Sequence, residues 1–141
     1  MMEDNVIQNK SKAFALRIIR MYKWLIQEQK EFVLSKQCLR SGTSIGANIR
    51  EGINAQSKAE FIAKLQISVK EANETMYWLE LLYETEFITQ EMYDSIYPEC
   101  VELFKLLTSI IKTTKSNYNL YFIMYRRTSY QPLQTFVNCK L

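Results

Sequence analysis

The sequence predicts an all-α protein, an antiparallel up-down-up-down four-helix bundle followed by an irregular aromatic C-terminal tail. Four long stretches repeat apolar residues at intervals of three and four, which is the spacing of one face of an α-helix. All three glycines of the 141-residue chain lie between Gly42 and Gly52, so glycine interrupts none of the other stretches. Short links separate the stretches, and short links favour antiparallel neighbours in a bundle. We expect the bundle to occupy residues 1–116 and the tail residues 117–141.

The first helix is predicted over about 9–29, after a frayed start. Its apolar face runs from Phe14 to Leu25 without a proline or glycine. Three basic residues fall on another face at steps of three: Arg17, Arg20 and Lys23.

The second helix is predicted over about 36–53, with Ser35 as its N-cap. Gly42 and Gly46 lie four residues apart on one face. Each glycine costs about 1 kcal/mol relative to alanine inside a helix, so we expect a neighbouring backbone or ring to approach closely there. The alternative is a helix that begins or breaks here, with Gly42 in a turn. Gly52 is predicted to end the helix as a left-handed C-terminal cap.

The third and fourth helices are predicted over about 58–85 and 90–115. Ser57 and Glu60 form a capping box, in which each side chain accepts from the backbone amide of the other residue. Thr89 is predicted to cap the fourth helix. Pro98 lies inside that helix and predicts a kink or a delayed start, because proline lacks an amide and crowds the preceding turn.

The tail differs in character from the bundle. Residues 120–125 form an aromatic and aliphatic run that favours a strand but has no evident partner strand. Packing across the bundle, packing on a neighbouring subunit and a loosely held tail all remain open.

Composition excludes several kinds of chemistry. The chain has no histidine, which removes the commonest general base and metal ligand. Glu80 and Glu84 share a helix face, but a solvated acidic surface or a subunit contact explains them better than a metal site. The glycines form no phosphate-binding pattern, and no serine has a base partner. We therefore expect no catalytic residues, no metal and no cofactor.

Cysteine spacing and hydropathy indicate the compartment. The three cysteines are far apart and form no CxxC pair, so we expect buried or half-buried thiols and neither a disulfide framework nor a zinc site; they are Cys38, Cys100 and Cys139. No apolar run is long enough to span a bilayer, and the N-terminus lacks the pattern of a secretory signal. We expect a cytoplasmic protein without membrane contacts.

Charge is distributed unevenly along the chain. The formal net charge is +3, with an excess of basic residues in 1–56 and of acidic residues in 57–116. The split indicates a basic face for polyanions, or subunits that join head to tail. An ordinary charged exterior is the alternative. The candidate phosphate-binding residues are Arg17, Arg20, Lys23, Lys36, Arg40 and Arg50.

Four aromatic residues near the predicted surface admit two interpretations. They can stack on nucleic-acid bases, or they can pack in the core or at an interface, which is the more common use of such rings. These residues are Tyr22, Trp24, Tyr77 and Trp78.

One stretch carries a family resemblance. Residues 37–52 read QCLRSGTSIGANIREG and are followed by SKAEF at 57–61 and ANET at 72–75. This pattern resembles the small bacterial four-helix-bundle proteins encoded in 23S rRNA intervening sequences. The accessory proteins of diversity-generating retroelements look like members of the same superfamily. The resemblance extends from the first helix to about Lys115 and does not include the tail.

The resemblance implies a left-handed bundle that assembles into a homopentameric ring with a basic surface. It further implies RNA or DNA as a partner and, for the retroelement relatives, a reverse transcriptase. Besides Arg40 and Ser41, the signature residues by position are Gly42, Ser44, Gly46, Asn48, Glu51 and Gly52. Asn48 and Glu51 are expected to make hydrogen bonds between helices.

Two functional hypotheses follow. The first is a non-enzymatic oligomeric accessory protein that binds RNA or DNA through a basic surface on the first two helices. The second is a protein–protein scaffold, or a reverse-transcriptase partner, without strong nucleic-acid affinity of its own.

Overall fold

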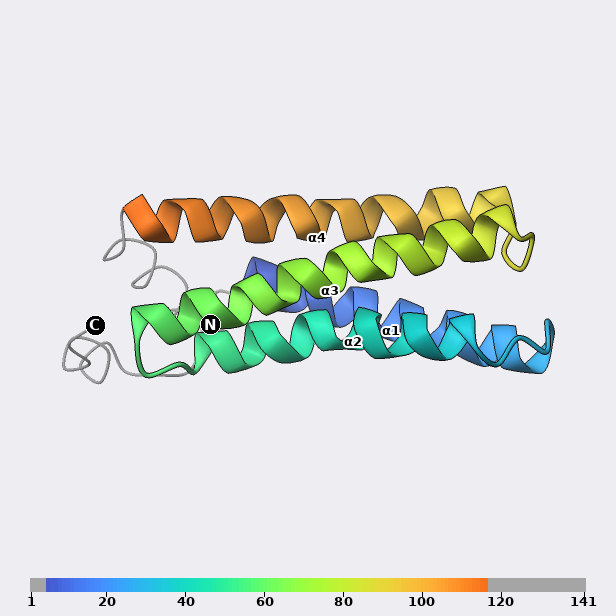
Figure 1. The fold of residues 1–141 in the computed structure, drawn as a ribbon, viewed down its shortest axis with the longest axis horizontal. Helices are drawn as coiled ribbons and strands as arrows, with labels where there is room; N and C mark the ends of the chain where they lie inside the picture. The colour runs from blue at the N-terminus through green and yellow to red at the C-terminus, as the bar shows by residue number, and fades with distance from the viewer. Residues whose placement is uncertain (1–4, 117–141) are drawn as a thin grey trace.

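The computed structural model describes residues 5–116, and within that range the chain forms four α-helices and no strand (Figure 1). The prediction of an all-α four-helix fold is confirmed. The aromatic tail and Cys139 lie outside the described residues. The helices are α1 (Val6–Gln27), α2 (Leu34–Ile53), α3 (Lys58–Glu84) and α4 (Gln90–Ser116).

Successive helices run in opposite directions (Figure 1). Contacting residues fall in opposite order along each pair. Between α2 and α3, for example, Ser41 bonds to Thr75. One turn later in α2, Ile45 bonds to Ser68, which lies nearly two turns before Thr75 in α3. The short links between helices make this arrangement the natural one.

One apolar core fills the space between the helices. Each helix supplies residues at the predicted intervals, and full burial of one such side chain contributes about 1.5–3 kcal/mol. The largest fully buried apolar side chains are Phe14, Ile18, Leu25, Ile45, Ile49, Leu65, Leu79, Leu82, Leu103 and Leu107.

The start of α1 lies earlier than predicted. Asn5 is the N-cap, and its side chain accepts a 3.2 Å hydrogen bond from the amide of Gln8. The helix therefore begins at Val6, within the region predicted to fray.

The cap of α2 also differs from the prediction. Ser35 lies inside the helix, and its hydroxyl donates to the backbone oxygen of Glu31 over 2.8 Å. The Glu31 carboxylate performs the capping instead, accepting from the amides of Val33, Leu34 and Ser35 at 3.0, 2.8 and 2.6 Å. Burial on its own raises the pKa of Glu31, but these hydrogen bonds outweigh it and hold the pKa below its ordinary value.

The caps of α3 and α4 largely follow the prediction. Ser57 accepts from the amide of Glu60 at 3.1 Å, while the Glu60 carboxylate accepts from Gln56 rather than from Ser57. Thr89 caps α4 through the amide of Met92 at 3.1 Å. The predicted delay caused by Pro98 is wrong, because α4 is already helical from Gln90.

Gly42 and Gly46 let α1 approach α2. Both lie inside the helix, so the alternative of a turn at Gly42 is wrong. A Cβ at Gly42 would lie 3.0 Å from two carbons of Ile18, and one at Gly46 would lie 3.3 Å from the hydroxyl of Ser11. The predicted close approach is confirmed, and its partners are these side chains rather than a ring.

Gly52 lets α3 approach α2 closely. Its predicted role as a left-handed cap is wrong. No described glycine has a positive φ, and the C-cap of α2 is Asn54. A Cβ at Gly52 would lie 2.8 Å from Cδ1 of Leu65 and 3.2 Å from Cβ of Lys64.

Buried hydrogen bonds join α3 to its two neighbours. Thr75 donates to the hydroxyl of Ser41 at 2.8 Å, and Ser68 donates to the backbone oxygen of Ile45 at 2.9 Å. On the other side, the thiol of Cys100 contacts the backbone oxygen of Ala72 at 3.3 Å. Cys100 and Cys38 are both buried free thiols, as predicted.

Candidate nucleic-acid interface

Arg17 faces α4 rather than a basic surface shared with α2. Its guanidinium donates to the backbone oxygen and hydroxyl of Ser95 at 3.1 and 2.7 Å and forms an ion pair with Glu99. Its charge is therefore largely neutralised within the chain.

Arg40 is tied to α3 in a similar way. One terminal nitrogen lies 2.9 Å from Oε1 of Glu74, and the same oxygen accepts from the indole nitrogen of Trp78 at 3.1 Å. The Arg40 side chain is still 62% exposed, so its outer nitrogens remain accessible to an anion.

The other four predicted residues are exposed on α1 and α2. Within the described part of the chain none of them forms an ion pair, so each presents a full positive charge to solvent; they are Arg20, Lys23, Lys36 and Arg50. The structure thus divides the six candidates into two that are held by acidic partners and four that are not.

A groove opens between α1 and α4. These two helices contact each other less extensively than the other neighbouring pairs do. The groove has a volume of about 410 Å³, with Arg20 on the α1 side and Glu91 on the α4 side. Its remaining lining residues are Arg17, Met21, Trp24, Met92, Ser95 and Ile96.

The signature polar residues of α2 have local roles. Asn48 donates to the backbone oxygen and hydroxyl of Ser44 in its own helix, at 2.9 and 3.0 Å, so the predicted bond between helices is wrong for Asn48. Glu51 does connect two helices, through an ion pair of 2.8 Å with Lys64 of α3. It does so at the exposed edge of the interface, and this pairing raises the pKa of Lys64.

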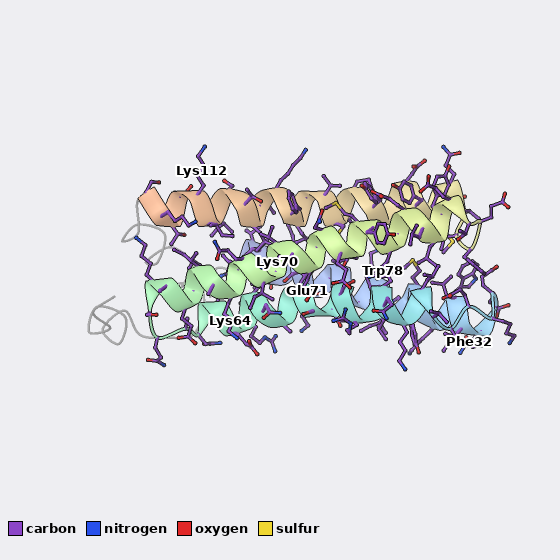
Figure 2. The ribbon with its side chains drawn as sticks, in the orientation of Figure 1. Phe32, Lys64, Lys70, Glu71, Trp78 and Lys112 are labelled. Carbon is purple, nitrogen blue, oxygen red and sulfur yellow. The ribbon has the colours of Figure 1, made fainter. Side chains whose placement is uncertain are left out.

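Glu71 was not singled out by sequence reasoning. One of its carboxylate oxygens is buried and has no hydrogen-bond partner among the described residues. Burial and the nearby charge of Glu74 raise the pKa of Glu71, although Arg40 opposes this effect. Lys64, Glu71 and Trp78 follow one another along α3 (Figure 2).

One member of the acidic pair on α3 bonds to a tyrosine of α4. Glu80 accepts a 2.8 Å hydrogen bond from the hydroxyl of Tyr97, which raises the pKa of that tyrosine. In residues 5–116 no three cysteine or acidic side chains converge as metal ligands would. The described helices also include none with the length and apolar character needed to cross a membrane.

The predicted surface aromatics fall into two groups. Trp24 and Trp78 are half-buried and pack against the core. Tyr77 is 53% exposed and lies beside Trp78, with ring centroids 5.2 Å apart. Of the four rings considered for base stacking, Tyr77 is the most open to a base, while Tyr22 is half-buried.

A family model for 23S rRNA-intervening sequence proteins matches residues 3–109. The chain belongs to this family. The match includes α1, α2, α3 and most of α4, and it confirms the resemblance carried by the second helix.

A solved structure extends the comparison. It is described as a protein with unknown function from the S23 ribosomal protein family of Bacteroides thetaiotaomicron VPI-5482, determined at 1.70 Å resolution. The two chains are 64% identical, with a TM-score of 0.75, over 76% of this chain and 99% of that one. No curated protein matches the chain.

In this family member, the glycines of α2 pack against neighbouring helices, and two of its cationic residues are exposed. Gly42 and Gly46 face α1 and Gly52 faces α3, while Lys36 and Arg50 are exposed. The glycine spacing of the stretch therefore specifies helix packing, and the exposed cations are the part left to meet a partner.

Proposed function

We propose that this family member is a non-enzymatic, oligomeric accessory protein that acts in the cytoplasm and binds RNA or DNA through basic side chains of α1 and α2. The observation that carries the proposal is the set of exposed cations without acidic partners in the described chain: Arg20, Lys23, Lys36 and Arg50. Such side chains contact phosphates without reading base sequence.

The structure refines the contribution expected from each residue. Arg17 would have to exchange Glu99 for phosphate, and Arg40 would share its guanidinium between Glu74 and phosphate, so both contribute less to binding. Among residues 5–116, Lys23, Lys36 and Arg50 have no such partner to give up. They are the residues on which the proposal chiefly depends.

The oligomer is part of the proposal. The family resemblance suggests a ring of five copies. A ring repeats the exposed cations around its circumference, and contacts made by several copies to one nucleic acid strengthen overall binding without any new type of contact.

The test is binding as a function of salt. A structured 23S rRNA fragment and a DNA duplex of equal length are titrated with the full chain by fluorescence anisotropy at several salt concentrations. The wild type is compared with the triple variant Lys23→Ala, Lys36→Ala and Arg50→Ala. Each lost phosphate contact should reduce the magnitude of the slope of log K against log salt by about 1. The slope of the triple variant should therefore be smaller in magnitude by up to about 3.

A charge-matched control carries Lys70→Ala, Lys105→Ala and Lys112→Ala, which removes three exposed cations from α3 and α4. It should bind nearly as well as the wild type. The proposal fails if the wild type binds neither nucleic acid at low salt, or if the control loses as much affinity as the α1 and α2 variant.

The second candidate is a protein–protein scaffold, or a reverse-transcriptase partner, without nucleic-acid affinity of its own. The opposite charges of residues 1–56 and 57–116 favour it. Part of that charge is used inside the chain, where Lys10, Arg17 and Arg40 pair with acidic residues of α3 and α4. An oligomer that dissociates in salt and binds no nucleic acid in the same titration would support this candidate over the first.

A further inference from the structure

The link between α1 and α2 presents two adjacent apolar side chains to solvent. Phe32 is 59% exposed and Val33 is 70% exposed, the highest values among the large hydrophobic residues of the described chain. Phe32 lies at the end of the bundle where α1 turns into α2 (Figure 2), and Val33 follows it in the same link. We call this pair the apolar tip.

The apolar tip is held in a fixed shape. Three amides around it, including that of Val33, donate to the buried carboxylate of Glu31. The amide of Glu31 itself donates to the backbone oxygen of Leu25 at 3.1 Å. Lys30 adopts a left-handed conformation with φ of 53°, which completes the reversal. A preorganised apolar pair loses little conformational freedom on docking.

The α1–α4 groove has the character of a receptor for such a tip. Its apolar lining includes two methionines, Met21 and Met92, together with Trp24 and Ile96. Methionine adapts to irregular partner shapes, and methionine and aromatic residues are enriched at protein interfaces.

Charge favours one orientation of the tip in the groove. Lys30 flanks the apolar tip and is exposed. The α4 side of the groove carries Glu91, and Asp94 is exposed in the next turn, whereas the α1 side carries Arg20. Lys30 would therefore meet the carboxylates of the α4 side and lie away from Arg20, which favours approach in this orientation.

We propose that the apolar tip of one copy of this chain docks in the α1–α4 groove of a second copy. The tip does not fill the groove of its own chain, because Phe32 and Val33 are solvent-exposed in the folded bundle and the link is fixed by Glu31. Each copy offers one tip and one groove, so the contact is heterologous and can close into a ring. This inference rests on the oligomeric part of the proposed function and names its interface.

The experiment is a complementation test by light scattering on the full chain. A tip variant carries Phe32→Asp and Val33→Asp and keeps its groove. A groove variant carries Glu91→Arg and Met92→Arg and keeps its tip. Each variant alone should fall to the mass of one chain, 16.7 kDa. Their equimolar mixture should recover a species of twice that mass, because one intact tip and one intact groove remain.

The control variant carries Val6→Asp and Leu16→Asp, two exposed apolar residues outside both surfaces. It should keep the wild-type mass, and circular dichroism should show that every variant is folded. The docking inference is overturned if a folded tip variant keeps the wild-type mass, or if the mixture stays at the mass of one chain. A monomeric wild type would overturn the oligomeric proposal as well, whereas nucleic-acid binding is read separately in the anisotropy titration.

Discussion

The α2–α3 and α1–α4 interfaces of this bundle are built in different ways. At α2–α3 the helices meet across a glycine, Gly52, and buried hydroxyls, with Thr75 donating to Ser41. At α1–α4 long charged side chains bridge the edges, as Arg17 does to Glu99, and a groove of about 410 Å³ remains.

The difference separates stability from binding. Small side chains let backbones approach and bury hydroxyls that must then be satisfied, so the α2–α3 interface depends on fit. Ion pairs at exposed edges contribute little to stability, and the space they leave is accessible to a partner. Substitutions should therefore damage the fold at α2–α3 and mainly alter association at α1–α4.

The largest effect is expected at Gly52. Gly52→Leu places a side chain where even a Cβ would lie 2.8 Å from Leu65. Overpacking of this kind costs about 1–3 kcal/mol, measured as the free energy of unfolding in urea. Ala47→Leu, at an exposed position of the same helix, is the control and should change stability by less than about 0.5 kcal/mol.

Gly46→Leu applies the same test to the α1–α2 interface. Ser11 lies 3.3 Å from the Cβ position, so we expect a loss above about 1 kcal/mol. A neutral result would mean that α1 does not approach α2 at this glycine.

An intermediate effect is expected at Glu31, at the corner that presents the apolar tip. Glu31→Gln removes the charge from a cap that holds three amides and should cost about 1 kcal/mol at pH 7. Because the folded-state pKa of Glu31 is lowered, its stabilisation is present above the ordinary carboxyl value of about 4.3. It is lost as the pH falls through the folded-state pKa.

Urea unfolding from pH 7 to pH 3 checks this dependence. The stability difference between wild type and Glu31→Gln should shrink on the acid side. Glu28→Gln, in the same link but exposed, is the matched control. A difference for Glu31→Gln that stays constant with pH would contradict the capping role.

The smallest effect is expected at the α1–α4 edge. A double-mutant cycle of Arg17→Ala and Glu99→Gln should give a coupling of about 0.2–1 kcal/mol. Salt at about 1 M should remove this coupling, because the Debye length at that concentration is about 3 Å. A larger coupling that resists salt would remove the contrast between the two interfaces.

The sequence predicted what local chemistry determines. The helices follow from the apolar intervals, and the caps at Ser57 and Thr89 depend on residues three positions away. The close approach at Gly42 could be inferred because glycine inside a helix needs a compensating contact. Its partner, Ile18, could not be inferred, because the alignment of α1 against α2 is a tertiary property.

The predictions were wrong at residues whose type suits more than one structural role. Ser35 suits an N-cap, but Glu31 takes the amides because a carboxylate is the stronger acceptor. Gly52 suits a left-handed cap, but α2 continues past it because α3 packs against it. Asn48 bonds to Ser44 in the preceding turn, as asparagine often does within a helix.

The basic residues could be found from sequence, but their availability could not. Arg17 and Arg40 are held by carboxylates on α4 and α3 that are distant in the chain. Lys23 and Lys36 form no ion pair among residues 5–116. The apolar tip gave no sequence signal either, because Phe32 and Val33 lie in a short link whose exposure depends on the Glu31 cap.

The buried thiols of the core have a consequence for chemical labelling. Burial raises the pKa of Cys38 and raises that of Cys100 to about 12. Thiolate is the form that reacts with alkylating agents and oxidants, so in the folded protein both thiols are almost entirely protonated and shielded. Modification of Cys38 or Cys100 therefore requires the helices to separate, and its rate reports how often the bundle opens.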